Sequence, residues 1–327
     1  MCNMKFNQYE KTLYNDEDAG KAYLLTLVVP IFFGFILTVI FNAIAVKSGL
    51  VNFSKSPALY CIYLILVNGS MLATYFLYNK YSKTNFAKAS LIKFKFGWKN
   101  LLMCVAVAFI TLFGSLYLIN YLFELLSKIG YNPDASLPLP LTNGWWLILN
   151  LVVLALIPAI CEELLYRGII MNGLRKFGDV GAIFISALFF ALAHGSAMQF
   201  FYQFILGVVL SAVVIKTGSI VASAVVHFLN NAIVVVYNYI FAQTGATEPA
   251  FTPAIIAIAF SVAIVAGLLL WLIFHFTKEN NKENSQNIVY TETYKAQART
   301  FSSSKSILFF ATSLIVAVAL WCVGTFV

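Results

Sequence analysis

Charged residues are scarce in this sequence. They make up 10% of its 327 residues, whereas a soluble domain carries about 25%. Hydrophobic residues make up 61%, so the chain has too little polar surface to cover an exterior that faces water. A soluble globular protein is therefore excluded, and lipid is the expected solvent.

The sequence also lacks the common signatures of metal sites built from cysteine or histidine. Its five cysteines are scattered without a CxxC pair, so neither a disulfide framework nor a cysteine-bound metal is indicated. No HExxH motif is present, and there are three histidines in all. The net charge of +8 resides in segments between apolar runs rather than on a soluble module, so we expect no nucleic-acid partner.

Long apolar runs are what the chain has instead. Eight long stretches contain no Asp, Glu, Lys or Arg: 22–46, 56–79, 100–123, 135–161, 180–215, 217–247, 249–277 and 306–327. Each reaches the roughly 20 residues that a helix needs to cross the hydrocarbon core. The run 180–215 is long enough to cross twice, with a break expected at Gly195-Ser196. The sequence therefore predicts an all-α fold, a polytopic transmembrane helical bundle with about nine spans.

The placement of lysine and arginine favours nine spans over eight. If 180–215 crosses twice, 18 of the 21 basic residues lie on one side of the membrane. Cytoplasmic loops are enriched in Lys and Arg. We therefore expect a cytoplasmic N-terminus and an integral, multi-pass protein of a bacterial cytoplasmic membrane, with the lipid bilayer as its surroundings.

One predicted span carries three charged residues, Glu162, Glu163 and Arg167, within a helix expected over 145–176. Charged side chains inside a membrane are costly and usually mark function. Glu163 and Arg167 are four residues apart and so face the same side of a helix, which predicts an ion pair between them. Glu162 projects about 100° away with no basic neighbour on its own helix, which leaves it free to handle a proton or a metal. Placement at the membrane boundary, where such residues are tolerated, is the alternative.

Two histidines and an asparagine fall in the neighbouring spans. His194 lies in FFALAHGS, and His227 and Asn231 are four residues apart in VVHFLNNAIV. If the chain turns near Gly178, Glu162 and His194 each lie about 24 Å along their helices from that turn. His227 and Asn231 lie about 16 and 22 Å beyond Lys216. We therefore expect all four polar groups to share one layer of the membrane.

In that order, EExxxR at 162–167, FxxxH at 190–194 and HxxxN at 227–231 resemble the three motifs of the CPBP intramembrane proteases. These proteins are also known as CAAX proteases and as bacteriocin-processing or Abi-type membrane proteins. The resemblance covers about 145–235. It implies a helical bundle with a water-filled cavity open to the cytoplasm and hydrolysis of a peptide bond in a membrane-associated peptide or protein.

The resemblance also implies a role for each motif residue. Glu162 would be the general base that, with His194, activates a water molecule. His227 and Asn231 would stabilise the oxyanion. Glu163 and Arg167 would support the site. The family is described both as metalloproteases and as glutamate-type proteases, so one zinc ion held by Glu162, His194 and His227 remains an open alternative, since two His and a Glu are an accepted ligand set.

The chain is then expected to divide into three regions. Residues 1–97 hold spans one and two and a basic cytoplasmic loop, and 98–243 form the catalytic core. Residues 244–327 hold span eight, a polar cytoplasmic linker at 277–305 and span nine. Two other functions stay open: a proton-coupled membrane transporter, because proton relays use the same residue types, and a non-catalytic immunity or scaffold protein of the same fold.

Overall fold

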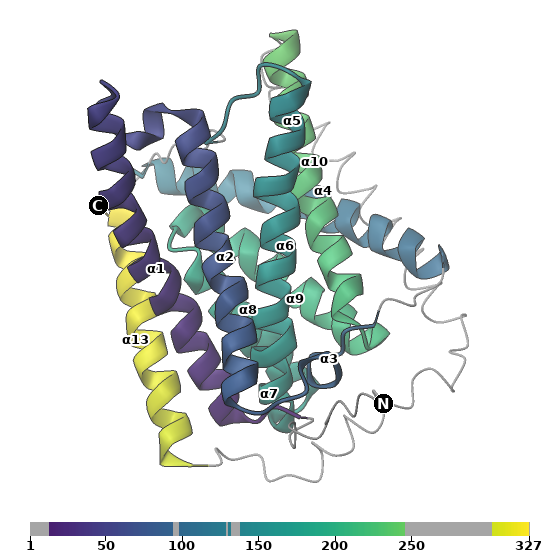
Figure 1. Cartoon of the computed structure of the whole chain (residues 1–327). Coiled ribbons are helices and arrows are strands. Elements are labelled where there is room, and N and C mark those ends of the chain that lie inside the picture. Colours follow the sequence, from purple (N-terminus) through teal and green to yellow (C-terminus); the bar gives the residue numbers. More distant parts are fainter. Residues whose placement is uncertain (1–12, 94–97, 129, 132–137, 246–302, 327) are drawn as a thin grey trace, which may run out of the picture.

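The computed structural model describes residues 13–93, 98–128, 130–131, 138–245 and 303–326, and in these residues all regular structure is helical (Figure 1). The α-helices are α1 (Asp16–Lys47), α2 (Pro57–Tyr81), α3 (Phe86–Ala89), α4 (Trp98–Lys128), α5 (Gly144–Asn150), α6 (Ile157–Glu162), α7 (Asn172–Leu174), α8 (Asp179–Ala193), α9 (Ala197–Thr217), α10 (Ile220–Thr244) and α13 (Ser304–Phe326). The short elements are η1 (Phe53–Lys55) and η4 (Arg175–Phe177), which are 3₁₀ helices, and η2 (Leu151–Leu156) and η3 (Glu163–Met171), which are π-helical. The predicted all-α fold is confirmed.

Six helical segments in the described residues are long and apolar enough to cross a membrane. They are Asp16–Lys47, Pro57–Tyr81, Gly144–Phe177, Gln199–Thr217, Ile220–Thr244 and Ser304–Val323. Two shorter apolar helices, Asn100–Ser115 and Asp179–Ala193, accompany them. In Figure 1 most of the helices run along the bundle, whereas α4 passes behind it at a steep angle. The protein is therefore an integral, multi-pass membrane protein.

The run 180–215 is broken as predicted, because α8 ends at Ala193 and α9 begins at Ala197. Gly195 lies in the break with a positive φ of 61°, and the Ser196 side chain caps the first turn of α9. The predicted turn at Gly178 is also present, and its φ of 87° favours glycine. These two turns place α8 against α9 and against the helix Gly144–Phe177, which carries the EExxxR motif and is called the motif helix below.

The helix from Gly144 to Phe177 is regular at its start and distorted in two places. The Asn143 side chain accepts hydrogen bonds from the backbone amides of Trp145 and Trp146, which starts the helix. The first π-helical stretch, η2, lies just before Pro158, whose ring removes one amide donor. The second, η3, begins at Glu163. π-Helical turns are frequent at functional sites, so both distortions are relevant to the motif.

α1 begins at Asp16, before the uncharged run 22–46 in which the sequence predicted a span. The reason is a capping box in which Asn15 and Asp18 exchange side chain–backbone hydrogen bonds. α4 also continues to Lys128, beyond the end of the uncharged run 100–123. Both differences arise because polar residues can extend a helix beyond its apolar part.

A buried polar cluster fastens this start of α1 to its neighbours, and we call it the N-terminal anchor. Its residues are Tyr14, Asp16, Asp18, Tyr78, Asn79 and Lys176. The Lys176 ammonium lies 2.9 Å from the Asp16 carboxylate, and both side chains are buried. The chain approaches so closely here that a Cβ at Gly173 would lie 2.4 Å from the Asn15 carbonyl oxygen. The anchor therefore ties α1 and α2 to the end of the motif helix.

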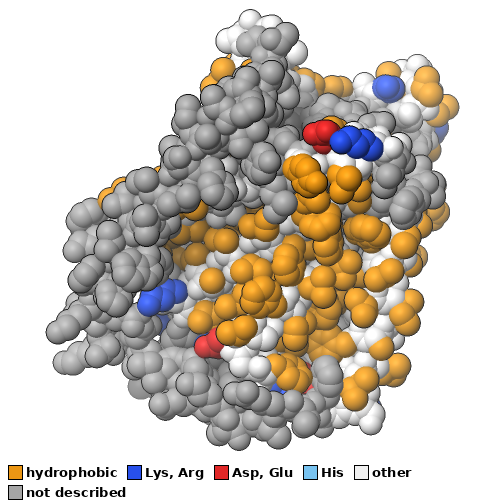
Figure 2. Space-filling view, turned by 180° about the vertical axis from the view of Figure 1, so that it is seen from behind, with side chains coloured by type: hydrophobic (Ala, Val, Ile, Leu, Met, Phe, Trp, Pro, Cys, Tyr) orange, Lys and Arg blue, Asp and Glu red, His pale blue; other side chains and the backbone are white. Residues whose placement is uncertain are grey.

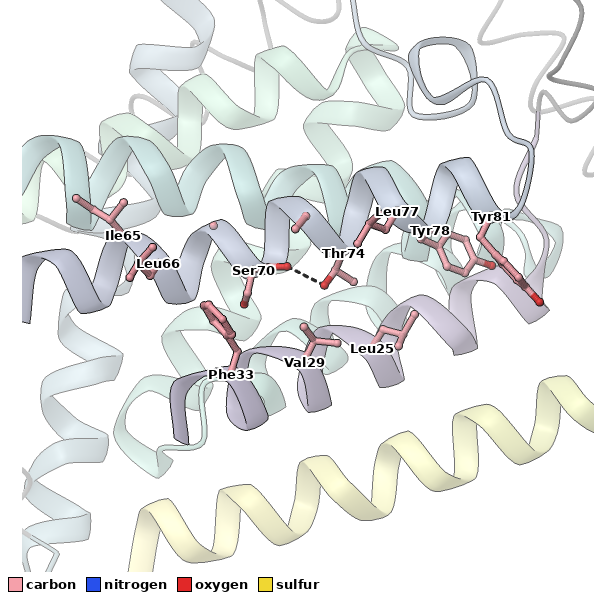
Figure 3. Close-up of a pocket in the computed structure, with 12 residues that line it drawn as sticks. Leu25, Val29, Phe33, Ile65, Leu66, Ser70, Thr74, Leu77, Tyr78 and Tyr81 are labelled. Atoms are coloured by element: carbon pink, nitrogen blue, oxygen red, sulfur yellow. Dashed lines mark hydrogen bonds between the residues drawn. The ribbon is translucent and has the colours of Figure 1, made fainter. Parts of the chain in front are cut away.

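The outer surface of the bundle is apolar. Figure 2 shows hydrophobic side chains covering most of the described part of one face. Between α1 and α2 the surface is hollowed into a groove of about 710 Å³ (Figure 3), lined mainly by Leu25, Val29, Phe33, Leu66 and Leu77. The Thr74 hydroxyl in this groove donates to the Ser70 carbonyl of its own helix. No motif residue lines the groove.

Span eight, predicted within the uncharged run 249–277, lies outside the described residues, as do the third histidine, His275, and most of the linker 277–305. The described ends on either side of this part of the chain lie at opposite ends of the bundle (Figure 1). α10 ends near Leu141, whose carbonyl accepts from Gln243, whereas α13 begins next to Glu17, which accepts from Ser303. α13 then runs alongside α1.

Candidate active site

The Glu163 carboxylate is the centre of the buried polar cluster in the middle of the bundle. It accepts a hydrogen bond of 2.7 Å from Arg167 Nη1 and one of 2.6 Å from the Ser223 hydroxyl. His227 Nδ1 lies 3.1 Å from Glu163 Oε1. The predicted pairing of Glu163 with Arg167 is thus confirmed, and Glu163 has two further partners on α10.

Arg167 is fully buried and is held by three different groups. Besides the Glu163 carboxylate, its Nη2 donates to the Gly207 carbonyl of α9 at 3.3 Å. The guanidinium also lies 4.4 Å from the centre of the Phe190 ring, a cation–π contact. Arg167 therefore neutralises Glu163 and connects the motif helix with α8 and α9.

Glu162 faces the other nitrogen of His227. Its Oε2 lies 3.8 Å from His227 Nε2, and the Glu162 side chain is 16% exposed, against 1% for Glu163. Glu162 Oε2 is itself buried, and no hydrogen-bond partner for it is present among the described residues. A buried carboxylate oxygen normally has a partner, so this atom is available to accept from a ligand or a water.

His194 joins the site through Phe190, one turn earlier on α8. Its Nδ1 lies 2.8 Å from the Phe190 carbonyl oxygen. The Phe190 ring meets the His194 ring edge-on at 4.7 Å between centres and the His227 ring at 5.9 Å. The spacing FxxxH therefore places one aromatic ring in contact with both histidines and with Arg167.

Asn231 contacts the distorted part of the motif helix. Its Nδ2 donates to the Leu154 carbonyl at 3.4 Å. This is the carbonyl that Pro158 leaves without its usual helical donor, because proline has no N–H. Asn231 lies one turn after His227 on α10, so Ser223, His227 and Asn231 form one stripe facing the motif helix.

The structure therefore brings Glu162, Glu163, Arg167 and His227 into direct contact. His194 and Asn231 reach the same region through the Phe190 ring and the Leu154 carbonyl. The sequence interpretation missed Ser223, although its position four residues before His227 was a usable signal. It also missed the pair formed by the Tyr202 hydroxyl and Asn230 Oδ1, for which no spacing rule exists because the two residues lie on different helices.

The side-chain atoms that Glu162, His194 and His227 can offer are of the types that bind zinc. Backbone and carboxylate oxygens accept only, so Nδ1 carries the proton in both His194 and His227 when each ring is neutral, and Nε2 then holds a lone pair. Zinc-bound histidines are usually fixed by such a contact to an oxygen acceptor. Glu162 Oε2 supplies a third donor. Among the described residues, however, no three His, Cys, Asp or Glu side chains are already arranged to hold a metal.

Residues 144–233 match the family model described as "Type II CAAX prenyl endopeptidase Rce1-like". The matched segment is somewhat more than a quarter of the chain and contains all three motifs. No curated protein and no solved structure matches the chain significantly. The resemblance that the motifs indicated is thereby confirmed: this part of the chain is similar to a family of CAAX-type intramembrane endopeptidases.

Proposed function

We propose that the protein is an intramembrane endopeptidase that hydrolyses a peptide bond in a membrane-associated peptide or protein of a bacterial cytoplasmic membrane. The observation that carries the proposal is the Glu162 carboxylate. One of its oxygens is buried without a partner among the described residues and faces a histidine at 3.8 Å. The family match over the same helices supports it.

Glu162 Oε2 is the general base of the proposed reaction. It takes a proton from a water molecule while the water oxygen bonds to the carbonyl carbon of the scissile peptide. When the C–N bond then breaks, the same carboxyl gives its proton to the departing amine nitrogen. His194 helps to hold the water, because its neutral ring presents Nε2 as an acceptor.

His227 and Asn231 stabilise the oxyanion. The amide Nδ2 of Asn231 is a donor in every state, and its resting bond to Leu154 is long enough to be exchanged for a better acceptor. His227 Nε2 can donate only when the ring is doubly protonated. The Glu163 and Glu162 carboxylates then face its two N–H groups. Glu163 and Arg167 thus support the site by fixing His227.

The neutral form of His227 corresponds to the zinc alternative. Glu162, His194 and His227 would hold the ion, which when bound lowers the pKa of a coordinated water to about 7. Metal content separates the two forms of the proposal. Zinc bound at one equivalent in the purified wild type and lost in His194→Ala would support the metal form, and activity that survives chelation in metal-free protein would exclude it.

The test of the function is cleavage by purified protein reconstituted in lipid. Wild-type protein is incubated with quenched fluorescent peptides, each anchored in the membrane with or without a farnesyl group on a C-terminal CaaX sequence. We expect cleavage that falls at least about 1,000-fold in Glu162→Gln and in His194→Ala. Glu124→Gln, at an exposed glutamate paired with Lys128, is the matched control and should cleave normally.

Two outcomes would overturn the proposal. One is wild-type activity in the Glu162→Gln protein. The other is ion or solute flux in the same proteoliposomes that depends on Glu162 and occurs without proteolysis, which would favour the transporter.

A further inference from the structure

A chain of side-chain hydrogen bonds leads from α9 to Asn231. The Tyr202 hydroxyl donates to Asn230 Oδ1. Asn230 Nδ2 donates to Asn231 Oδ1 at 3.3 Å, and Asn231 Nδ2 donates to the Leu154 carbonyl at 3.4 Å. Asn230 is 1% exposed, so the chain runs through the interior of the bundle.

The backbone end of this chain fixes its direction. Leu154 O is a carbonyl oxygen and can only accept, and Pro158 cannot occupy it. Asn231 must therefore turn its NH₂ group towards Leu154 and its oxygen towards Asn230. Asn230 must in turn present its NH₂ group to Asn231 and its own oxygen to Tyr202. A flipped amide at either asparagine would bring two acceptors or two donors face to face.

The hydroxyl of Tyr202 is what holds the other end. With the hydroxyl present, the Asn230 amide is hydrogen-bonded through both its oxygen and its NH₂ group in the orientation set from Leu154, and without it only the bond to Asn231 keeps that orientation. The aromatic body of Tyr202 packs against the buried cluster of Met103, Cys104 and Val226, so the hydroxyl is delivered from a fixed ring. The Tyr202 hydroxyl and the Leu154 carbonyl thus hold the same orientation of both amides from opposite ends.

We propose that Tyr202 and Asn230 are positioning residues that orient the Asn231 amide so that its NH₂ group faces the reacting carbonyl. This inference rests on the proposed function for the role of Asn231 but not for the hydrogen-bond chain itself. Neither residue touches the reacting atoms. Their effect is that Asn231 presents its NH₂ group to the oxyanion. If the amide were flipped, its oxygen would face the oxyanion and repel it.

Kinetics of Tyr202→Phe test the positioning. We expect kcat to fall about five- to tenfold, with KM within about twofold, because one hydrogen bond is lost while the ring stays. Ser211→Ala is the matched control, since it removes a buried contact between helices, with Ser186, and leaves the hydrogen bonds from Tyr202 to Leu154 intact. In an Asn231→Ala background, Tyr202→Phe should change kcat less than about twofold. An equal loss in both backgrounds would mean that Tyr202 acts only on stability and would overturn the proposal.

A second measurement needs no substrate. In protein labelled with ¹⁵N-asparagine, the side-chain NH₂ signals of Asn230 and Asn231 are assigned by their loss in Asn230→Leu and Asn231→Leu. We expect Tyr202→Phe to shift or broaden both signals and Ser211→Ala to shift neither. An unchanged Asn231 signal in Tyr202→Phe would overturn the inference. If the wild type cleaves no peptide, the proposed function fails, and these spectra still decide on the hydrogen-bond chain.

Discussion

Two buried polar clusters include residues of the same long helix, Gly144–Phe177, and they differ in how completely their carboxylates are paired. In the N-terminal anchor, Asp16 is matched by Lys176, and Asp18 accepts from Tyr78 through one oxygen and from the Asn15 amide through the other. In the candidate site, Glu163 is saturated in the same way, but its neighbour Glu162 keeps a buried oxygen without a partner among the described residues.

The difference separates a structural cluster from a functional one. Buried polar groups stabilise a fold when every hydrogen bond is made, and an unmade bond costs free energy. A site that must receive water or substrate has to leave such a bond open. Adjacent residues of one helix thus follow opposite rules, with Glu163 completing the architecture and Glu162 left available.

The largest effect on stability should come from breaking the anchor. Lys176→Met would remove the ammonium that lies against the buried Asp16 carboxylate, and we expect the free energy of unfolding to fall by about 3–5 kcal/mol. The free energy of unfolding is measured by titrating the protein with SDS at a constant lipid concentration. At a temperature where the variant stays folded, its kcat should remain within about twofold of wild type.

The control for this prediction removes both charges. Asp16→Asn combined with Lys176→Met removes both charges of this ion pair and should recover most of the lost stability. A loss of activity with stability intact would show that the anchor belongs to the catalytic machinery, and the contrast between the clusters would fail.

Ser223→Ala should have a smaller effect on stability but should also lower the catalytic activity. The Ser223 hydroxyl donates to the charged Glu163 carboxylate, and such bonds contribute about 1.5–3 kcal/mol. Because Glu163 also holds His227 Nδ1, we expect kcat to fall about tenfold as the ring loses its fixed support. The same unfolding and cleavage assays measure both.

Ser186→Ala provides the comparison for Ser223→Ala. Ser186 is equally buried on α8, but its hydroxyl contacts Ser211 and a backbone carbonyl rather than a charged group. The Ser186→Ala variant should lose less stability than Ser223→Ala and should keep its activity. If the two variants lose activity equally, Ser223 has no special relation to the site.

Sequence reasoning reached those parts of the fold and site that depend on a single helix. The charged helix predicted over 145–176 is observed as Gly144–Phe177, the break at Gly195-Ser196 is present, and the pairing of Glu163 with Arg167 follows from helical spacing. Within one helix, 3.6 residues per turn fixes which side chains are neighbours, so spacing is sufficient.

Contacts between helices were beyond that reasoning. The bonds from Glu163 to His227 and from Tyr202 to Asn230 depend on how each helix is rotated about its axis, which neighbouring helices decide through packing. The π-helical stretches change that rotation further, and no local pattern announces them. The catalytic roles of Glu162, His194, His227 and Asn231 stay predictions until cleavage is measured.

The smallest effect should come from Tyr23→Phe, and it tests whether the two clusters are independent. Tyr23 lies on α1 beyond the anchor, stacks on Phe189 at 4.2 Å and donates its hydroxyl to the Phe189 carbonyl at 3.1 Å. Phe189 precedes Phe190, whose ring contacts both site histidines, so this is a direct connection between α1 and the site. The stacked ring survives the substitution, and the Phe189 carbonyl keeps its helical position, so we expect a loss of about 1 kcal/mol in the free energy of unfolding and an unchanged kcat.

When Tyr23→Phe is combined with Ser223→Ala, the two stability losses should add within about 0.5 kcal/mol, because the residues share no partner. A coupling larger than that, or a kcat that falls with Tyr23→Phe alone, would mean that the α1 contact helps to set the position of Phe190. The N-terminal anchor and the candidate site would then act as a single unit.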